Sequence, residues 1–492
     1  MRLRELLDGI PIPVIGEAAD VEIRDIRYDS RLVGPGDLFV AIPGLETDGH
    51  RYIGAAAEKG AAAVVCERVP EVDIPYVLVK NSRWALARLS ANYFENPAEK
   101  LKLVGVTGTN GKTTTTFLLK SILEACTGEK VGLIGTNQNM IGALALETER
   151  TTPESYELHA LFRQMAEAGC TWAVMEVSSH SLVLDRVAGL TFEAGVFTNL
   201  TQDHLDFHVS MDEYAAAKAR LFGQCKRAVI NLDDGWAGQM LEAAGAGAVT
   251  FSVEKNEADY VAKDIRLKAD RVQFSVLAQN KLHRVIVHIP GAFSVQNALG
   301  VVACAGTLGI SPDEAAAALS QAKGVKGRVE VVETGGGYTV LIDYAHTPDA
   351  LENVLTSMKA VAPGRVVVLF GCGGDRDRKK RPLMGEAAAR LADYVIVTSD
   401  NPRTEPPDQI IADILTGLKG TKTPHSVIPD RRRAIAYALD HAQTDDVIIL
   451  AGKGHETYQI VGKTKYPMDE REIVAEHLAA MGAGETVKGI CE

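Results

Sequence analysis

The sequence predicts an α/β protein with three domains, two of which are built on parallel β-sheets. Apolar runs of strand length alternate with helix-like segments along most of the chain, which is the pattern of parallel sheets covered by helices. The chain has 492 residues, enough for about three domains of ordinary size. We expect the domains at 1–98, 99–327 and 328–492.

Two short breaks set these boundaries. A predicted helix over 82–94 ends at Glu95-Asn96-Pro97, because proline disfavours a helical conformation in the residue before it. The second boundary is the Gly-containing linker at 323–327. The first domain is predicted to be a compact α/β unit, with strand-like runs at 21–30, 36–44, 61–67 and 75–79.

The central domain is predicted to hold a parallel, doubly wound sheet. Strand-like runs follow the first apolar run, Leu103 to Val106, at 130–136, 171–177, 194–200 and 227–233. Helical stretches lie between most of them, for example at 155–168 and 211–222. Two alternating runs joined by a polar turn within 271–290 indicate a hairpin, and two Ala-rich helices are expected at 294–308 and 312–322.

The last domain repeats the alternation and is predicted to form an open parallel sheet of Rossmann-like type. Its strand-like runs lie at 338–345, 365–371, 394–400, 425–430 and 446–452. Ligands of such sheets lie at the carboxyl ends of the strands. Asp343, Arg376, Asp400 and Gly452 fall at or just after such ends. The turn at 371–374 does not complete a dinucleotide fingerprint, because Arg376 takes the place of its third glycine.

Composition points to a small-molecule enzyme. The formal net charge is −12 and no long Lys/Arg run occurs, which argues against a nucleic-acid surface. Seven scattered cysteines without a C-x-x-C pair indicate a reducing compartment and no zinc site. We expect neither a signal peptide nor a membrane span, since no window reaches about 18 apolar residues.

A phosphate site is predicted at Gly108-Thr109-Asn110-Gly111-Lys112-Thr113, between an apolar strand and a helix-like segment at 117–126. Glycines let backbone N–H groups turn toward phosphate oxygens, and the helix N-terminus adds partial positive charge. Lys112 would reach the β- and γ-phosphates, and the Thr113 hydroxyl would bind Mg²⁺. The strict pattern has glycine where this chain has Val106, so the match is a variant one. The alternative, a Gly-rich turn with an exposed lysine, does not explain the Gly-Lys-Thr ending.

Two further positions are candidates for metal binding. Glu176 ends the apolar run 171–176, where an acid on a neighbouring strand is well placed to hold Mg²⁺, although it could instead cap a helix or face solvent. His204 lies after another strand, next to Asp203 and Asp206, and polar clusters at strand ends are more often sites than packing.

Other candidates have weaker signals of their own. Lys218, in an amphipathic helix at 214–222, has the pattern of an ordinary surface lysine. Asn297 is either a contact to a nucleotide base or a polar residue on a helix face. Asp343 ends a strand directly before Tyr344-Ala345-His346-Thr347-Pro348.

Taken together, these motifs resemble the Mur ligase family over essentially the whole chain. TGTNGKT, MEVSSH, NLTQDHLD, the lysine of AAAKARLF, the Gly-Arg pair at 327–328 and DYAHTP occur in the family's order. DSRLVGPGDLFVAIPG, GCGGDRDRKKRP, SDNPRTE and AGKGHE resemble the branch of the family that attaches diaminopimelate.

The resemblance implies an ATP-dependent ligase of peptidoglycan precursor synthesis. Such an enzyme adds meso-2,6-diaminopimelate to the D-glutamyl γ-carboxylate of UDP-MurNAc-L-Ala-D-Glu through an acyl phosphate. The resemblance also implies ATP and Mg²⁺ as requirements, a cytoplasmic location, a monomer, and a role in cell shape and division.

The resemblance further implies four sets of site residues. ATP would be bound by Gly108, Thr109, Asn110, Gly111, Lys112, Thr113, Thr114, Asn297, Arg328 and Asp343. The metal would be held by Thr113, Glu176, His204 and Lys218 as a carbamate, and the catalytic set is Lys112, Lys218, His204 and Glu176. The UDP-precursor would be bound by Ser30, Leu45, Glu46, Thr47, Thr151, Thr152, Ser178 and Arg186. Diaminopimelate would be bound by Arg376, Asp400, Asn401, Pro402, Arg403, Gly452 and Glu456.

The match is incomplete at one position, and two other functions are consistent with the phosphate loop. Leu184 stands where some family members carry a glutamine contact. A sister enzyme, such as a lysine-adding ligase or folylpolyglutamate synthase, would use the same chemistry, but the Asp-Asn-Pro-Arg motif and the separate first domain argue against it. A nucleotide-hydrolysing switch or assembly protein would leave the segments at 399–405 and 451–456 without a role.

Overall fold

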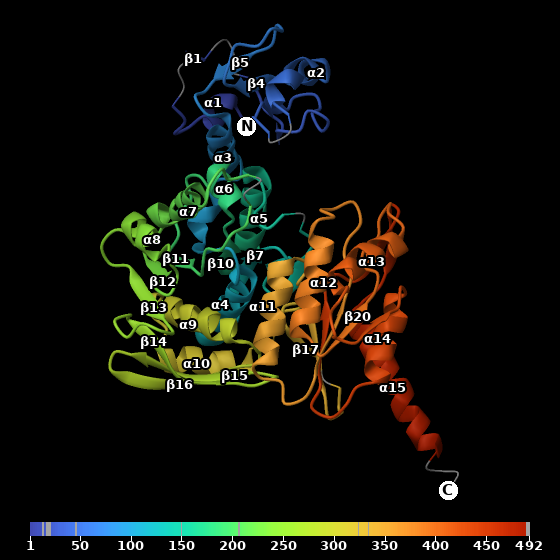
Figure 1. Cartoon of the computed structure of the whole chain (residues 1–492). Helices are drawn as coiled ribbons and strands as arrows, with labels where there is room; N and C mark the ends of the chain where they lie inside the picture. Colours follow the sequence, from blue (N-terminus) through green and yellow to red (C-terminus); the bar gives the residue numbers. More distant parts are fainter. Residues whose placement is uncertain are drawn as a thin grey trace. The chain divides into compact units, whose positions relative to one another are not determined.

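The structure is a computed structural model that describes residues 1–11, 14–15, 21–44, 47–148, 150–204, 207–322, 324–332 and 334–488. The chain divides into two compact units, and Figure 1 labels their helices and strands. The first contains Met1–Val261 and Leu299–Ala315, and the second contains Ala262–Ala298 and Ala316–Glu492. Both contain helices and mostly parallel sheets, which confirms the predicted fold class. The division into three domains stays a prediction.

The N-terminal part of the first unit is a small sheet with the strand order β1-β5-β4-β3-β2, parallel except at β1. Its strands are β1 Val14–Ile15, β2 Ile26–Arg27, β3 Leu38–Val40, β4 Ala63–Cys66 and β5 Tyr76–Leu78, with helices α1 Leu3–Leu6, η2 Gly49–Tyr52, α2 Ile53–Glu58, α3 Ser82–Tyr93 and η3 Pro97–Lys100. The strand predicted over 21–30 is much shorter. The Asp25 carboxylate accepts the Ile26 N–H, and the chain turns where Asp29 accepts the Arg31 N–H.

The largest sheet has eleven strands in the order β16-β15-β14-β13-β12-β11-β6-β10-β7-β8-β9. It is parallel from β14 to β7, while β8 and β9 form an antiparallel edge. Its strands are β6 Lys102–Thr107, β7 Lys130–Ile134, β8 Asn139–Ile141, β9 Leu144–Leu146, β10 Cys170–Glu176, β11 Ala194–Phe197, β12 Ala228–Asn231, β13 Val249–Ser252 and β14 Tyr260–Leu267. Strand β14 continues into the predicted hairpin, β15 Val272–Ala278 and β16 Lys281–Val287.

The helices predicted in this part of the chain are found close to their expected positions, and three short ones are found in addition. They are α4 Lys112–Thr127, α5 Ser155–Glu167, α6 Ser179–Val183, α7 Met211–Ala219, η4 Phe222–Gln224, α8 Ala237–Ala244, α9 Ala292–Thr307 and α10 Pro312–Gln321. Helix α4 lies between two glycines with positive φ, Gly111 at 82° and Gly128 at 69°. It therefore starts directly at the end of the phosphate loop and stops at a left-handed cap.

The main sheet of the second unit has the order β17-β18-β22-β19-β20-β21, with β17 antiparallel and the others parallel. Its strands are β17 Glu330–Val332, β18 Thr339–Asp343, β19 Val366–Phe370, β20 Tyr394–Val397, β21 His425–Val427 and β22 Val447–Ala451. Its helices are α11 Pro348–Lys359, α12 Lys380–Leu391, α13 Pro407–Leu415, η5 Thr416–Leu418, α14 Arg431–Asp440 and α15 Glu470–Lys488. Residues of α14 and α15 share a core with Ile342, Ile448 and Leu450.

A two-stranded hairpin, β23 Tyr458–Val461 and β24 Thr464–Pro467, was not predicted. All four residues of β24 are exposed, so the hairpin lacks the apolar alternation by which strands are found in a sequence.

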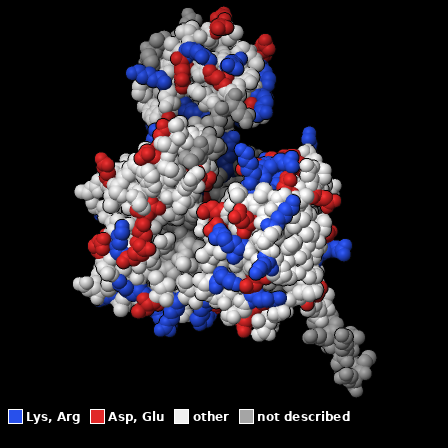
Figure 2. Space-filling model, viewed as in Figure 1, with Lys and Arg blue, Asp and Glu red and all other residues white. Residues whose placement is uncertain are grey.

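Within the described residues, no helix has both the length and the apolar composition that a membrane crossing requires. Acidic and basic side chains are intermingled on the face shown in Figure 2.

We predict that His159 makes the stability of the protein depend on pH. Its imidazole is buried on α5 and its Nδ1 has no hydrogen-bond partner among the described residues. Burial, assisted by Arg88, lowers its pKa from 6.5 to about 4. The unfolded chain then binds a proton that the folded chain excludes. The free energy of unfolding should therefore fall as pH drops from 6.5 toward 4.

Chemical denaturation at several pH values checks this prediction. His159→Phe should flatten that part of the pH dependence, whereas replacement of the exposed His425 by Phe should leave it as in the wild type. If the free energy of unfolding depends on pH in the same way in wild type and His159→Phe, His159 is not the source of the pH dependence.

Candidate functional site

The predicted phosphate loop joins β6 to α4 and is fastened to the end of β11. The Asn110 N–H donates to Asn199 Oδ1 at 2.9 Å, and Thr198 Oγ1 donates to the Asn110 carbonyl at 2.7 Å. The Lys112 ammonium donates to the carbonyls of Gly108 and Thr109, at 2.9 and 2.8 Å. The lysine therefore curls over its own loop, where a phosphate group would offer it stronger, charge-assisted hydrogen bonds.

Glu176 ends β10, the strand next to β6, and its carboxylate is buried. Oε1 accepts from Thr113 Oγ1 and from the Thr136 N–H, both at 2.9 Å, and Oε2 accepts from Thr136 Oγ1 at 3.0 Å. No ion pair reaches this carboxylate from the residues that the structure describes. A buried carboxylate beside a hydroxyl, without a cation, fits a hard divalent ion such as Mg²⁺.

Lys218, on α7, is fully buried, so the interpretation as an ordinary surface lysine is wrong. Its Nζ donates to the Gly108 carbonyl at 2.8 Å and lies 4.5 Å from the centre of the Tyr214 ring. Burial, and then the nearby Lys112 ammonium, hold its pKa well below its usual range, with Asp203 acting in the opposite direction.

His204 is placed differently from the other predicted metal ligands. Its side chain is about half exposed, its backbone φ is 53°, and its Nε2 lies 3.6 Å from Asp203 Oδ2. The imidazole lies edge-on to that of His180, with ring centres 5.0 Å apart. Among the described residues, no hydrogen bond or ion pair joins His204 to Glu176 or Lys218, and no group of three His, Cys, Asp or Glu side chains forms a metal site. Asp206 lies outside the described residues.

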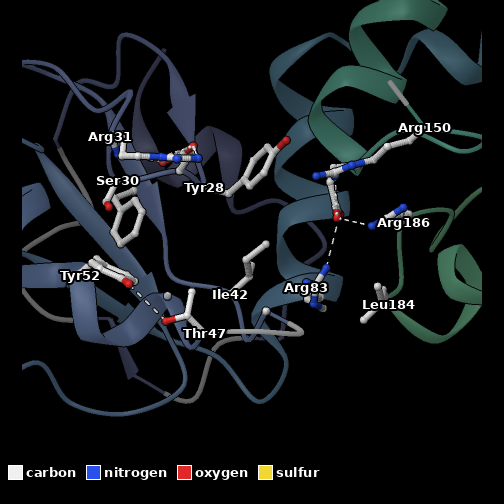
Figure 3. A pocket seen from close by; sticks show the side chains of 15 residues that line it. Tyr28, Ser30, Arg31, Ile42, Thr47, Tyr52, Arg83, Arg150, Leu184 and Arg186 are labelled. Carbon is white, nitrogen blue, oxygen red and sulfur yellow. Dashed lines mark hydrogen bonds and ion pairs between the residues drawn. The ribbon is translucent and has the colours of Figure 1, made fainter. Parts of the chain in front are cut away.

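A cavity of about 600 Å³ in the first unit contains several residues predicted to bind the UDP-precursor (Figure 3). Ser30 and Thr47 line it from the N-terminal part, and Arg186 and Leu184 line it from the segment after α6. Leu45 and Glu46 lie outside the described residues.

Three arginines converge on one buried carboxylate in this cavity. Glu154 lies 2.7 Å from Arg186, 3.2 Å from Arg150 and 3.4 Å from Arg83. Figure 3 shows Arg83 and Arg186 approaching it from different elements. A second acid, Asp29, pairs with Arg31 at the cavity's edge. The cavity lining therefore has more arginines than acids, which suits an anionic ligand.

Hydrogen bonds connect this cavity to Glu176 through the other predicted precursor residues. Thr151 Oγ1 lies 3.0 Å from Thr136 Oγ1, and Thr152 Oγ1 donates to the Glu176 carbonyl at 2.8 Å. The Ser178 N–H donates to Thr152 Oγ1, and Arg186 donates to the Thr152 carbonyl at 3.0 Å.

In the second unit, predicted site residues gather at the carboxyl ends of neighbouring strands. Asp343 ends β18 and accepts the N–H groups of Val329 and Ala345. Burial raises its pKa, with Arg328 acting in the opposite direction. The Arg328 guanidinium lies 4.9 Å from the centre of the Tyr344 ring. Asn297 is buried on α9, and Thr114 is buried on α4 of the first unit.

The segment Asp400-Asn401-Pro402-Arg403 follows β20 and pairs with the β23–β24 hairpin. Asn401 Nδ2 donates to Glu456 Oε2 at 2.8 Å, and the Arg403 N–H donates to the Ile460 carbonyl. Arg403 has a φ of 50°, and its Nη1 donates to the Gly374 carbonyl at 2.9 Å. Arg376 is exposed and donates to the Asp375 carbonyl. Gly452, with a φ of 113°, follows β22.

Sequence reasoning missed three charged residues of these sites: Arg83, Glu154 and Lys453. Glu154 lies two residues after Thr152, and Lys453 lies between two glycines directly after an apolar strand. These neighbours in the sequence could have identified Glu154 and Lys453 as site residues. Arg83, in the first turn of a helix, has no comparable signal.

Three models of one family match the chain in order along its length. The model described as "Mur ligase family, catalytic domain" matches residues 22–94, "Mur ligase middle domain" matches 106–305, and "Mur ligase, glutamate ligase domain" matches 327–454. The chain belongs to the Mur ligase family. Curated relatives and solved structures agree with this membership.

One curated Mur ligase relative, from Caldanaerobacter subterraneus subsp. tengcongensis, is 50% identical over 97% of this chain and 99% of its own length. Another, from Clostridium tetani, is 46% identical over 97% of this chain and 99% of its own length. Both are named UDP-N-acetylmuramoyl-L-alanyl-D-glutamate–2,6-diaminopimelate ligase. A solved structure with the same name has 32% identity and a TM-score of 0.73, covering 98% of this chain and 99% of its own.

We predict that Gly108→Ala weakens ATP binding. A Cβ at this position would lie 1.9 Å from Thr198 Oγ1, and the φ of 153° disfavours any side chain. The loop must move, so its N–H groups lose their alignment. The dissociation constant for ATP, measured by calorimetry, should rise about tenfold or more.

Gly128→Ala is the matched control. Gly128 also has a positive φ, but it lies at the other end of α4 and a Cβ there would meet no atom within 4 Å. This variant should lose about 1 kcal/mol of stability and keep its ATP affinity. Equal ATP affinities for both variants would contradict the prediction.

Proposed function

We propose that this Mur ligase attaches 2,6-diaminopimelate, in its meso form, to UDP-MurNAc-L-Ala-D-Glu at the expense of ATP, in peptidoglycan precursor synthesis. The observation that carries the proposal is the 50% identity to a relative of that name over 97% of the chain. The phosphate loop, the arginine-rich cavity and the Asp400–Arg403 segment supply one candidate site for each of the three substrates.

The reaction needs ATP because a carboxylate is a poor electrophile. An oxygen of the D-glutamyl γ-carboxylate attacks the γ-phosphorus of ATP, the bond to the bridging oxygen breaks, and ADP leaves. The neutral amine of diaminopimelate then attacks the carbonyl carbon of the acyl phosphate. The tetrahedral intermediate expels phosphate, the nitrogen loses a proton, and an amide bond remains. No protein nucleophile is required.

The chain's own residues bind and orient the phosphates. Lys112 would exchange the Gly108 and Thr109 carbonyls for the β- and γ-phosphate oxygens, and so stabilise charge on the transferring group. Thr113 and Glu176 are the residues that would hold Mg²⁺, together with His204 and a modified Lys218. The bound metal would neutralise part of the phosphate charge. We assign Asn297, Arg328 and Asp343 to the nucleotide as well.

Lys218 is proposed to carry a carbamate. The neutral amine nitrogen would bond to the carbon of CO₂ and release one proton, which converts a neutral amine into an anion. Two features support this: its position in the family motif, and its burial 2.8 Å from the Gly108 carbonyl beside a second lysine. An ammonium here would repel a metal ion, whereas a carbamate would bind it or its waters.

The cavity with Ser30, Thr47 and Arg186 is proposed to bind the anionic UDP-precursor. Thr151, Thr152 and Ser178 are proposed to direct the peptide part of the precursor toward Glu176. We also propose the three-domain division at 98 and 327, a monomer, and a cytoplasmic location, where ATP and UDP-linked precursors are available.

Arg403 is proposed to select diaminopimelate over lysine. Diaminopimelate has one more carboxylate, which a guanidinium can bind with two hydrogen bonds. Lysine would bring an ammonium toward the same arginine. Arg376, Asp400, Asn401, Pro402, Gly452 and Glu456 complete the proposed amino-acid site.

An amino-acid screen tests the proposed function. Wild type and Arg403→Ala are incubated with UDP-MurNAc-L-Ala-D-Glu, ATP, Mg²⁺ and either diaminopimelate or lysine, and the product is identified by mass. Wild type should prefer diaminopimelate in kcat/KM, by as much as about 10⁴-fold, since a site built around a polar partner rejects a ligand that lacks it. Arg403→Ala should lose most of that preference. ADP release that needs neither the precursor nor an amino acid would support a nucleotide-hydrolysing switch instead.

We predict that Lys218→Ala lowers kcat by about 10²-fold or more, because a charge that stabilises the transferring phosphate is lost. Added acetate or formate should restore part of the activity by filling the place of the carbamate. Lys226→Ala, which removes an exposed lysine paired with Glu193, serves as the control and should keep full activity. Mass measurement of the intact wild type under CO₂ should detect the adduct. Full activity in Lys218→Ala would rule the carbamate out.

A further inference from the structure

A fully buried lysine lies beneath the proposed amino-acid site and has no assigned role. Lys453 follows β22, between Gly452 and Gly454, whose φ angles are 113° and 53°. A Cβ on Gly454 would lie 2.6 Å from Tyr344 Cβ and 2.8 Å from the Gly327 carbonyl. The two glycines let the loop fold back closely, and the lysine side chain is thereby directed into the interior of the second unit.

The Lys453 ammonium contacts three residues of the proposed site. Its Nζ lies 3.1 Å from Asn401 Oδ1, 3.1 Å from Glu456 Oε2 and 3.5 Å from Asp400 Oδ1. These residues come from two segments more than 50 positions apart in the sequence. One buried side chain thus ties the loop after β20 to the loop after β22.

These contacts also fix the direction of the Asn401 amide. Oδ1 accepts from Lys453 and, at 2.9 Å, from the Ile460 N–H, so Nδ2 must face Glu456, to which it donates at 2.8 Å. Without the ammonium, Oδ1 would keep the Ile460 N–H, but Glu456 would lose a charged donor. The carboxylates of Asp400 and Glu456 would then repel each other without a cation between them.

The charge of the cluster suits an amino-acid ligand. Lys453 balances one of the two acids, which leaves one negative charge. Asp400 Oδ1 is buried, and apart from its ion pair with Lys453 at 3.5 Å it has no hydrogen-bond partner among the described residues. An ammonium group of the amino-acid substrate would supply both the charge and the donor.

We propose that Lys453 is a positioning residue for the amino-acid substrate: it holds Asn401 and Glu456 in the binding arrangement and itself contacts no reacting atom. This inference rests on the proposed function, because it assigns the cluster to that substrate. A purely structural role would instead lower stability and affect all substrates alike.

The second unit offers a matched control for that distinction. Arg365 pairs at 2.6 Å with Asp446, whose side chain is buried. Arg365 and Asp446 precede β19 and β22, so their pair lies at the amino ends of the same strands whose carboxyl ends hold the cluster. Loss of the Arg365–Asp446 ion pair removes a cation from a buried acid of the same sheet, at the end opposite the proposed amino-acid site.

The test compares Lys453→Met and Arg365→Met with wild type, in the full-length enzyme. Steady-state KM is measured for diaminopimelate, ATP and the UDP-precursor, and thermal unfolding is followed in parallel. Lys453→Met should raise KM for diaminopimelate about tenfold or more and leave the other two KM values within about twofold. Arg365→Met should lower Tm and leave all three KM values unchanged.

Three results overturn the proposal: an unchanged KM for diaminopimelate in Lys453→Met, a parallel rise in all three KM values, or an equal rise in Arg365→Met. If Lys453→Met does not fold, Lys453→Gln, which also removes the charge, replaces it, and an unchanged KM for diaminopimelate in that variant also overturns the proposal. A wild type that does not use diaminopimelate refutes the proposed function instead, so the two failures are distinguishable.

Discussion

Two ammonium groups share one backbone carbonyl at the centre of the first unit. The Gly108 oxygen accepts from Lys112 at 2.9 Å and from Lys218 at 2.8 Å. Burial, and then the neighbouring Lys112 ammonium, hold the pKa of Lys218 low, and Lys112 also donates to the Thr109 carbonyl. On the proposed function, a phosphate group on the loop or a carbamate on Lys218 would place an anion beside the two lysines. Strand β6, the loop and α7 all serve to bring these two lysines to the same oxygen.

Hydrogen bonds of Glu176 connect the loop to the cavity proposed for the precursor. Its carboxylate binds Thr113 of the phosphate loop and Thr136, while its backbone carbonyl accepts from Thr152, whose own carbonyl accepts from Arg186. A continuous set of hydrogen bonds therefore runs from the loop to an arginine that lines the cavity. On the proposed function, this set of hydrogen bonds connects the nucleotide site and the precursor site through Glu176.

The sequence was informative where one signal determined the outcome. Apolar runs located the central strands of both large sheets, but not β8, β9, β13, β14 or β17, and Gly-Lys-Thr located the turn between β6 and α4. It was uninformative where burial depends on a partner distant in the sequence. Lys218 has the local pattern of a surface lysine, yet it is buried, with its ammonium against the Gly108 carbonyl, 110 positions earlier in the chain. The β23–β24 hairpin has no apolar alternation, since its contact with the Asn401–Arg403 segment is made by backbone groups and an asparagine.

On the proposed assignment of residues 400–403 to the amino acid, that hairpin makes substrate choice a property of two segments instead of one. The Arg403 N–H and carbonyl bond to the Ile460 carbonyl and the Gly462 N–H, and Asn401 accepts from the Ile460 N–H. In evolutionary terms, residues 400–403 and the hairpin must vary together. A recombination point between them would separate a recognition loop from the scaffold that gives it its shape. Specificity for a new amino acid is therefore more accessible by exchange of the whole stretch from β20 through β24 than by exchange of the motif alone.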